Sequence, residues 1–204
     1  MRAVAKSDLT GRARLREAAL ELFAERGFEA TSTRAVAAAA GLSPALVTRH
    51  FGSKQGLRAA VDEYVLDRIG GELRDLDPGE GLMASLGEVS ARLFGADPVL
   101  RGYLRQVLLE DSEASAALFG RLLAGARAEV ERLSEAYGEQ GPDEEWAPFQ
   151  MLCLILGPLL LERVMQPNLR EPMFAPDMLA RRSAANQQLL LRGYYGRLEE
   201  GAGG

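Results

Sequence analysis

The residues that could carry chemistry in this sequence gather between positions 32 and 54, where hydroxyls, cations and the chain's only histidine lie together. His50 follows Arg49, and Lys54 comes four residues later. Hydroxyl and cationic side chains bind phosphate oxygens, whereas a catalytic or metal-binding histidine needs partners. There is no second histidine, and the only cysteine, Cys153, lies far along the chain. The pattern predicts anion binding, with no catalytic residue and no metal ligand.

Enzyme signatures are absent from the sequence. It contains no metal-ligand spacing, no glycine-rich phosphate loop and no nucleophile elbow, so we expect neither an enzyme nor a cofactor. The paired acids Glu144 and Glu145 stand at a predicted helix start, where the helix dipole favours negative charge.

Length and composition are those of a soluble globular protein. The chain has 204 residues, of which 47% are apolar and 26% charged. A single cysteine fits a reducing compartment, and the longest apolar run, residues 151–161, is too short for a bilayer. No signal peptide is recognisable. We therefore expect a cytoplasmic protein without a membrane partner.

The charge is unevenly distributed. Residues 1–60 hold ten Lys or Arg against five Asp or Glu, which gives this segment a net charge of +5. Because the net charge of the whole chain is −5, the other 144 residues together carry −10. A basic segment attached to an acidic body is expected where one module meets an anionic surface.

Helical periodicity runs through the whole chain, and convincing strand alternation is absent. The segment 10–28 carries one apolar stripe, residues 31–41 form a short helix capped by Thr31 or Ser32, and Ser43-Pro44 and Ser53 begin two more. Longer helices are predicted at 82–95, 98–110, 113–137, 144–165 and 176–198. The fold class is all-α, with about nine helices.

The stretch "AAAAGLSP" predicts a helix-turn-helix. Gly41 allows a positive φ, Leu42 points inward, and Ser43-Pro44 starts the next helix at once. In this motif the second helix lies in the DNA major groove. Helical geometry then turns Val47 and Phe51 toward the core. The outward positions are Pro44, Ala45, Thr48 and Arg49.

Residues 15–61 resemble the DNA-binding domain of the tetracycline-repressor (TetR) family of bacterial transcription regulators. The resemblance runs through "AALELFAERGFEATSTRAVAAAAGLSPALVTRHFGSKQGL", with many spaced positions matching in order. It implies that phosphates are held by Ser32, Thr33, Thr48, His50 and Lys54. It also implies base contacts by Arg34 and by residues of the third helix, and it places Ser43, Pro44 and Ala45 among the DNA-contacting positions. Arg49 would supply either a phosphate contact or a guanine contact. Thr48 stands where the family very often has tyrosine, and Arg49 where an aromatic residue is frequent.

The resemblance also implies a body that binds a small molecule and pairs with a second copy. By composition, the candidate ligand residues are Tyr103, Arg105, Trp146, Phe149, Gln150 and Cys153. The last two helices would form the dimer interface, at positions that include Leu154, Gly157, Leu161, Ala185 and Leu189. Cys153 itself reads as an inert core thiol because its neighbours are apolar.

These observations predict a DNA-binding domain at 1–66 and a ligand-binding and dimerisation domain at 67–204. The expected function is a homodimeric regulator, most readily a repressor, that a largely apolar small molecule releases from a palindromic operator on double-stranded DNA. The alternative is the same fold acting as a protein-interaction adaptor without operator binding.

Overall fold

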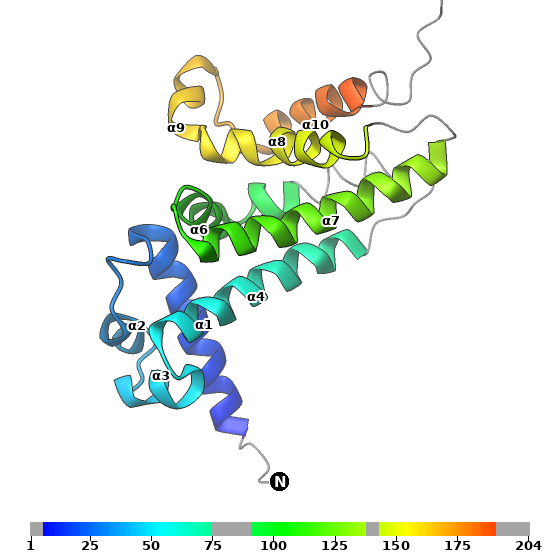
Figure 1. Ribbon diagram of the computed structural model, residues 1–204. Coiled ribbons are helices and arrows are strands. Elements are labelled where there is room, and N and C mark those ends of the chain that lie inside the picture. Colours follow the sequence, from blue (N-terminus) through cyan, green and yellow to red (C-terminus); the bar gives the residue numbers. More distant parts are fainter. Residues whose placement is uncertain (1–5, 75–90, 138–142, 191–204) are drawn as a thin grey trace, which may run out of the picture. The chain divides into compact units, whose positions relative to one another are not determined.

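A computed structural model describes residues 6–74, 91–137 and 143–190 (Figure 1). All its regular elements are helical, and no described residue lies in a strand, which confirms the all-α prediction. The chain forms two compact units. Residues 6–69 and 97–118 belong to the first, and described residues within 70–96 and 119–204 belong to the second.

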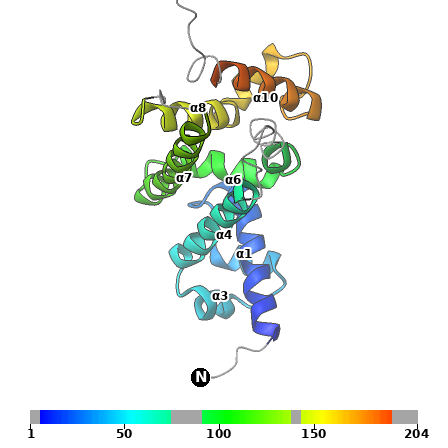
Figure 2. The same ribbon diagram turned by 90° about the vertical axis from the view of Figure 1, so that its right-hand side faces the viewer.

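The first unit contains five helices. They are α1 (Lys6–Arg26), α2 (Thr33–Ala39), α3 (Pro44–Phe51), the first three-quarters of α4 (Lys54–Arg74) and α6 (Pro98–Leu108). Helix α1 packs against α2, α3 and α6 (Figures 1 and 2). The predicted apolar stripe of α1 supplies much of this core, with Leu15, Ala19 and Phe23 at most 2% exposed.

Close contact between α1 and α6 depends on a glycine. A Cβ added to Gly102 of α6 would lie 3.2 Å from both the Cβ and the carbonyl oxygen of Ala24 in α1. The missing side chain lets the two helix backbones approach, and Leu100, Tyr103 and Leu104 of α6 are almost fully buried around this contact.

Capping residues explain where the helices of the first unit begin. The Ser32 hydroxyl accepts from the Ala35 N–H at 3.1 Å and caps α2. Thr31, the other predicted candidate, instead donates to the Gly27 carbonyl at 2.8 Å and satisfies the end of α1. Ser53 caps α4 by accepting from the Gly56 N–H at 3.0 Å, as predicted.

The second unit holds a π-helical turn, η1 (Ala91–Gly95), and most of α7 (Glu113–Tyr137). It continues with α8 (Trp146–Leu160), α9 (Glu162–Met165), the 3₁₀ turn η2 (Gln166–Asn168) and α10 (Pro176–Leu190). Helix α10 packs on η1, where Leu179 lies against Gly95. The predicted helix at 82–95 lies partly outside the described residues, as does the end of the one at 176–198.

The single helix predicted at 144–165 is wrong, because the chain bends there by 69° between α8 and α9. Pro158 lies inside α8 near its end and has no N–H to donate to the preceding turn. Helix α8 ends two residues later, and Leu161 forms the corner.

No single helix among the described residues is long and apolar enough to cross a membrane. The bent pair 146–160 and 162–168 meets that criterion only when its two parts are taken together.

Asp97 ties the start of α6 to α4 within the first unit. Its carboxylate accepts from the Leu100 N–H at 2.9 Å and from Arg68 Nη1 at 2.7 Å. Burial of the carboxyl acts to raise its pKa, but the bonds from Leu100 and Arg68 outweigh burial, so the pKa of Asp97 lies below 3.8.

We predict that Asp97→Ala lowers the free energy of unfolding by about 1 kcal/mol at pH 7, because the helix cap and the ion pair are both lost. A depressed pKa in the folded state stabilises the protein above the unfolded pKa and stops doing so as the pH falls through the folded value. Urea unfolding from pH 7 to pH 3 should therefore show the difference between wild type and variant shrinking below about pH 4. A pH-independent difference would contradict this assignment.

Candidate nucleic-acid interface

Helices α2 and α3 form the predicted helix-turn-helix. Helix α2 ends at its C-cap Ala40, Gly41 takes a φ of +64°, and α3 begins at Pro44. The Leu42 N–H donates back to the Ala37 carbonyl at 2.9 Å and closes the turn. A left-handed backbone at this corner favours glycine, so the sequence itself specifies the crossing of the two helices.

Helix α3 presents one buried and one exposed face. Val47 is 1% exposed and anchors the helix in the core. The four outward positions predicted from periodicity, Pro44, Ala45, Thr48 and Arg49, are all exposed. Ser32, Arg34 and Ser43 are exposed as well, and Thr33 is half-buried. This part of the predicted DNA-contacting set therefore lies on the accessible surface of the motif.

Two other predicted phosphate contacts lie against the protein's own surface. The buried Nε2 of His50 lies 3.7 Å from where a Cβ would stand on Gly11 of α1, and it has no hydrogen-bond partner among the described residues. Lys54 Nζ lies 4.2 Å from the centre of the Phe28 ring and donates to the Glu29 carbonyl at 3.3 Å. An ammonium group has three donors, so this contact occupies only part of its capacity.

Two arginines of α1 that the sequence analysis did not select hold the motif in place. Arg14 Nη2 lies 2.5 Å from the carbonyl oxygen of Ala40, at the end of α2. Arg12 Nη1 donates at 3.1 Å to the carbonyl oxygen of His50, near the end of α3, with its guanidinium 4.9 Å from the centre of the Phe51 ring. Cations at helix C-termini are stabilising because of the unpaired carbonyls there. The basic run "GRARLR" at the start of the first apolar stripe was the sequence feature that could have pointed to these two arginines.

The candidate ligand residues are divided between the two units. Tyr103 and Arg105 are on α6 in the first, and Tyr103 is buried with its hydroxyl bonded to Asp62 at 2.6 Å. Trp146, Phe149, Gln150 and Cys153 are on α8 in the second unit. There the Phe149 ring lies 5.8 Å from Trp146 and 6.2 Å from Phe119 of α7, centre to centre.

Cys153 is exposed, so the expectation of a core thiol is wrong. Met151, Leu152, Leu156 and Leu159 form the buried side of α8, and position 153 falls on the other side. Within the described residues, no group of three or more His, Cys, Asp or Glu side chains is placed to hold a metal ion.

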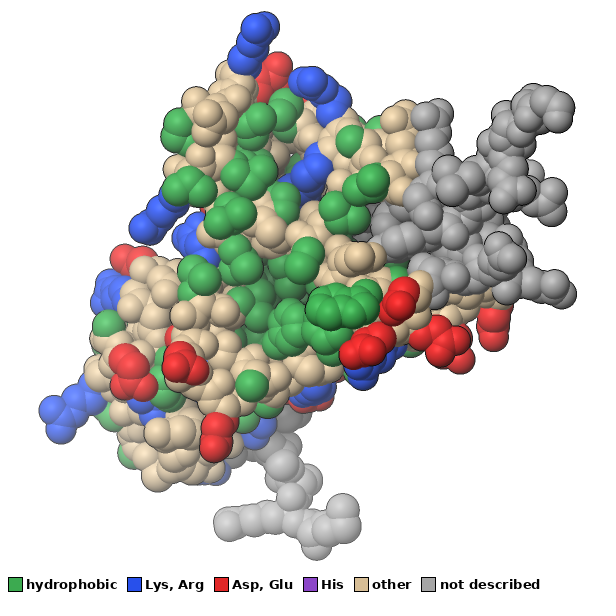
Figure 3. All heavy atoms as spheres, turned by 45° about the horizontal axis from the view of Figure 1, so that its top comes forward, with side chains coloured by type: hydrophobic (Ala, Val, Ile, Leu, Met, Phe, Trp, Pro, Cys, Tyr) green, Lys and Arg blue, Asp and Glu red, His purple; other side chains and the backbone are tan. Residues whose placement is uncertain are grey.

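The second unit exposes large apolar side chains on α8, the corner after it, α9 and α10. Figure 3 shows apolar side chains gathered on the face formed by these helices. The most exposed are Trp146 (59%), Leu161 (52%), Val164 (66%) and Leu189 (60%). Of the other predicted interface positions, Ala185 is exposed, and Leu154 and Gly157 are half-buried. Clustered exposed apolar side chains are typical of protein interfaces.

Comparison with known proteins finds similarity in the N-terminal part of the chain. Residues 15–61 match the sequence model described as bacterial regulatory proteins of the tetR family. The HTH-type transcriptional regulatory protein RaaS of Mycobacterium tuberculosis is 56% identical over 63 residues, which are 31% of this chain and 29% of RaaS. The dual regulator CecR of Shigella flexneri is 36% identical over 92 residues, 45% of this chain and 36% of CecR.

Solved structures extend the similarity in fold to nearly the whole chain. A transcriptional regulator from Rhodococcus sp. Rha1 superposes with a TM-score of 0.71 at 22% identity, covering 90% of this chain and 97% of that one. FadR from Bacillus subtilis, solved in complex with stearoyl-CoA, gives a TM-score of 0.69 at 16% identity, covering 89% and 98%. Residues 15–61 are thus similar to the tetR family of bacterial regulatory proteins, and the chain spans about a third of the length of the curated relatives it matches. The solved structures show that the fold is shared over most of the chain.

We predict that Arg14→Ala loosens the turn between α2 and α3 and costs about 1 kcal/mol of stability, because the Ala40 carbonyl loses its cation. Hydrogen exchange of the backbone N–H groups at positions 41–43, 45 and 46 should accelerate. The control is Arg26→Ala, since Arg26 is exposed at the end of α1 and pairs with its neighbour Glu25 at 3.3 Å. Equal exchange at these positions in both variants would show that Arg14 does not brace the turn.

Proposed function

We propose that this protein is a homodimeric transcription regulator that binds double-stranded DNA through residues 1–66 and senses a small molecule through residues 67–204. The observation that carries the proposal is the exposed face of α3 on a helix-turn-helix, with Arg49, Thr48, Ala45 and Pro44 outward and Val47 buried. The match of residues 15–61 to the tetR family of regulatory proteins supports the same proposal.

The proposed contacts fall into two groups. The hydroxyls of Ser32, Thr33 and Thr48 would bind phosphates. Lys54 and His50 would also bind phosphates once the DNA-binding domain, residues 1–66, lies on the duplex. Arg34 and Arg49 would read guanine edges, and Pro44 and Ala45 would contact thymine methyls. With Thr48 in place of a tyrosine, the aromatic anchoring surface is replaced by a single hydroxyl.

We predict that the protein binds DNA from upstream of its own gene, with an affinity that falls steeply as salt rises, because phosphate contacts release counterions. Arg49→Ala should weaken specific binding by about 1–3 kcal/mol per subunit if it reads a base. Fluorescence anisotropy over a range of salt concentrations measures both effects, and Arg26→Ala serves as an exposed-arginine control.

The same titration separates the regulator from the adaptor. An adaptor without operator binding would show no preferred duplex at any salt concentration, and Arg49→Ala would behave like Arg26→Ala.

Dimerisation would use the exposed apolar face of α8–α10. The DNA-binding domains of the two subunits, about 34 Å apart, would then bind successive major grooves on one side of a duplex. This is the geometry that a palindromic operator requires.

We predict that Leu189→Glu converts a dimer to a monomer in analytical ultracentrifugation, because the charge would be buried in the interface. Leu109→Glu is the matched control, since Leu109 is 65% exposed against 60% for Leu189 but lies on the first unit. A Leu189→Glu protein that sediments as the wild type would exclude α10 from the interface.

A largely apolar effector is the third part of the proposal. The aromatic group formed by Phe119, Trp146 and Phe149 in the second unit supports it. The stearoyl-CoA complex of the structurally similar FadR points to acyl chains as first probes. The effector would have different affinities for the conformer that binds DNA and the conformer that does not, and this difference would shift the population between them. An effector that prefers the second conformer would release the repressor from its operator. Trp146, the only tryptophan, is an intrinsic fluorescence probe for such titrations.

A further inference from the structure

One arginine of the second unit faces inward from the last described helix. Arg182 lies on α10 one turn after Leu179, which is 2% exposed and packs on η1. Residues three apart on a helix share a side, so Arg182 lies on the packed side of α10. The residue is half-buried, and its Nη1 is buried with no hydrogen-bond partner among the described residues.

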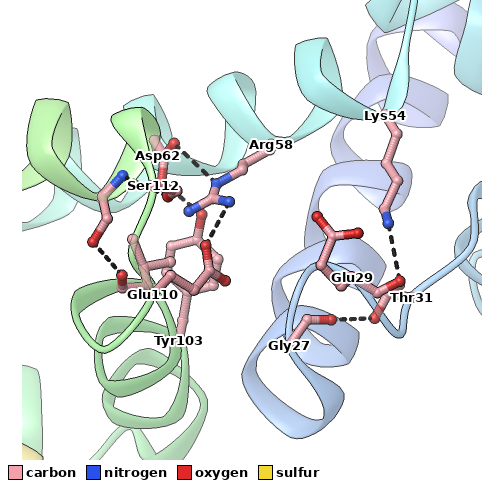
Figure 4. Close-up of polar contacts among 11 residues, drawn as sticks. Gly27, Glu29, Thr31, Lys54, Arg58, Asp62, Tyr103, Glu110 and Ser112 are labelled. Carbon is pink, nitrogen blue, oxygen red and sulfur yellow. Dashed lines mark hydrogen bonds and ion pairs between the residues drawn. The ribbon is translucent and has the colours of Figure 1, made fainter.

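The buried arginine of the first unit shows what such a side chain normally requires. The Arg58 side chain is 7% exposed, and two carboxylates lie beside it (Figure 4). Its Nη1 lies 2.7 Å from Oε2 of Glu110, and its Nε lies 4.0 Å from Oδ2 of Asp62. A buried charge is costly unless it is paired, and these two acids supply the pairing.

Arg182 has no carboxylate beside it within the described part of the chain. Its guanidinium carbon lies 5.8 Å from the centre of the Phe174 ring. Burial lowers the pKa of Arg182, and no neighbouring carboxylate opposes that effect. An arginine nevertheless keeps its charge near neutral pH, because its ordinary pKa is very high. Arg182 is therefore a partly buried cation whose counter-charge is not supplied by the described residues.

Contacts around this cation hold its neighbours in place. The Gln166 side chain accepts from the Met173 N–H at 2.7 Å, which fixes the chain just before Phe174. A Cβ on Gly95 of η1 would lie 2.7 Å from Cδ1 of Leu179 and 3.7 Å from the Phe174 carbonyl oxygen. Helix α10, η1 and the chain at Phe174 are thus packed together. A charge presented by such a packed frame loses little conformational entropy when it binds an anion.

The elements that meet here are otherwise apolar. Leu93 and Phe94 of η1 are buried, and Phe174 is half-buried. Single π-helical turns such as η1 frequently lie at functional sites. A small-molecule site is typically apolar with a few polar anchors, and a guanidinium pairs with a carboxylate through two parallel hydrogen bonds. A phosphate dianion would bring two charges to a single cation, so a monocarboxylate is the better match.

We propose that Arg182 binds the carboxylate of a small organic acid, whose apolar part lies against Phe174 and η1. The inference rests on the proposed function and deepens it, because it assigns the effector to the monocarboxylates that carry an apolar chain or ring. The acid supplies Nη1 with the acceptor that the described residues do not provide. Since Arg182 is half-buried and not fully enclosed, an anion can reach it from solvent.

The test uses the full chain, with octanoate as the probe and 1-octanol as its uncharged counterpart, in isothermal titration calorimetry at fixed salt and neutral pH. Arg182→Met removes the charge and keeps the apolar stem, whereas Arg182→Lys keeps the charge without the planar fork. Arg181→Met is the matched control, because Arg181 is the adjacent residue and is exposed, with its Nη1 3.5 Å from Sδ of Met178.

We expect wild type to bind octanoate about tenfold or more tightly than 1-octanol, because only octanoate pairs with the guanidinium. Arg182→Met should lose that preference and leave 1-octanol binding unchanged. Arg182→Lys should fall between the two, and Arg181→Met should match wild type. Arg182→Met should also melt at the wild-type temperature or above it, because a buried charge without a counter-charge is removed. A purely structural arginine would lower the melting temperature instead.

Three results would overturn the proposal. The first is octanoate binding that is absent, no tighter than that of 1-octanol, or unchanged in Arg182→Met. The second is equal affinity for inorganic phosphate, which would refute the carboxylate class. The third is an Arg182→Met protein that sediments as a monomer, beside a dimeric wild type, with unchanged octanoate affinity. The counter-charge of Arg182 would then come from the second copy of the chain.

DNA binding, measured separately on upstream DNA, distinguishes failure of this inference from failure of the proposed function. A wild type that binds octanoate through Arg182 but binds no duplex would refute the regulator and leave the carboxylate site. A wild type that binds an operator but shows no octanoate binding that depends on Arg182 would refute the site and leave the regulator.

Discussion

Burial of one face of α1 is the constraint on which the first unit depends. Leu15, Ala19 and Phe23 have almost no exposure, and the same helix packs against α2, α3 and α6. Removing apolar side chains from water is the main favourable contribution to such packing. Helix α6 approaches α1 closely at Gly102, and His50 of α3 lies 3.7 Å from the Cβ position of Gly11, so a shift of either helix toward α1 would displace α1.

Polar contacts then define the arrangement that apolar packing alone would leave adjustable. Arg14 and Arg12 hold the ends of α2 and α3, Asp97 joins the start of α6 to α4, and Arg58 with Glu110 joins its end. Hydrogen bonds have directional requirements that apolar contacts lack. The recognition helix is therefore held by the basic residues of α1 as well as by Val47, its one fully buried side chain.

The positive charge of the first 60 residues serves two purposes. Some of its cations, such as Arg34 and Arg49, lie on the exposed surface of the helix-turn-helix, where they favour an anionic partner. Others, such as Arg12, Arg14 and Arg58, interact with carbonyls, rings or carboxylates of the protein itself. The net charge of a segment therefore overstates the number of cations available to DNA, because some of the cations make contacts within the folded protein.

Periodicity and turn chemistry alone determined the helical fold, the helix-turn-helix and the outward positions of α3. Gly41, Ser43-Pro44 and the apolar spacing act within one or two turns, so they can be read without knowing what lies opposite. Pro98, Glu113 and Pro176 mark helix starts for the same reason, and the structure begins α6, α7 and α10 there. The tertiary structure alone decided the exposure of Cys153, the contacts of His50 with α1 and of Lys54 with Phe28, and the burial of Arg58 beside Glu110. Each of these depends on contacts between residues distant in the chain or on which side of an apolar helix is covered, and local sequence carries no record of either.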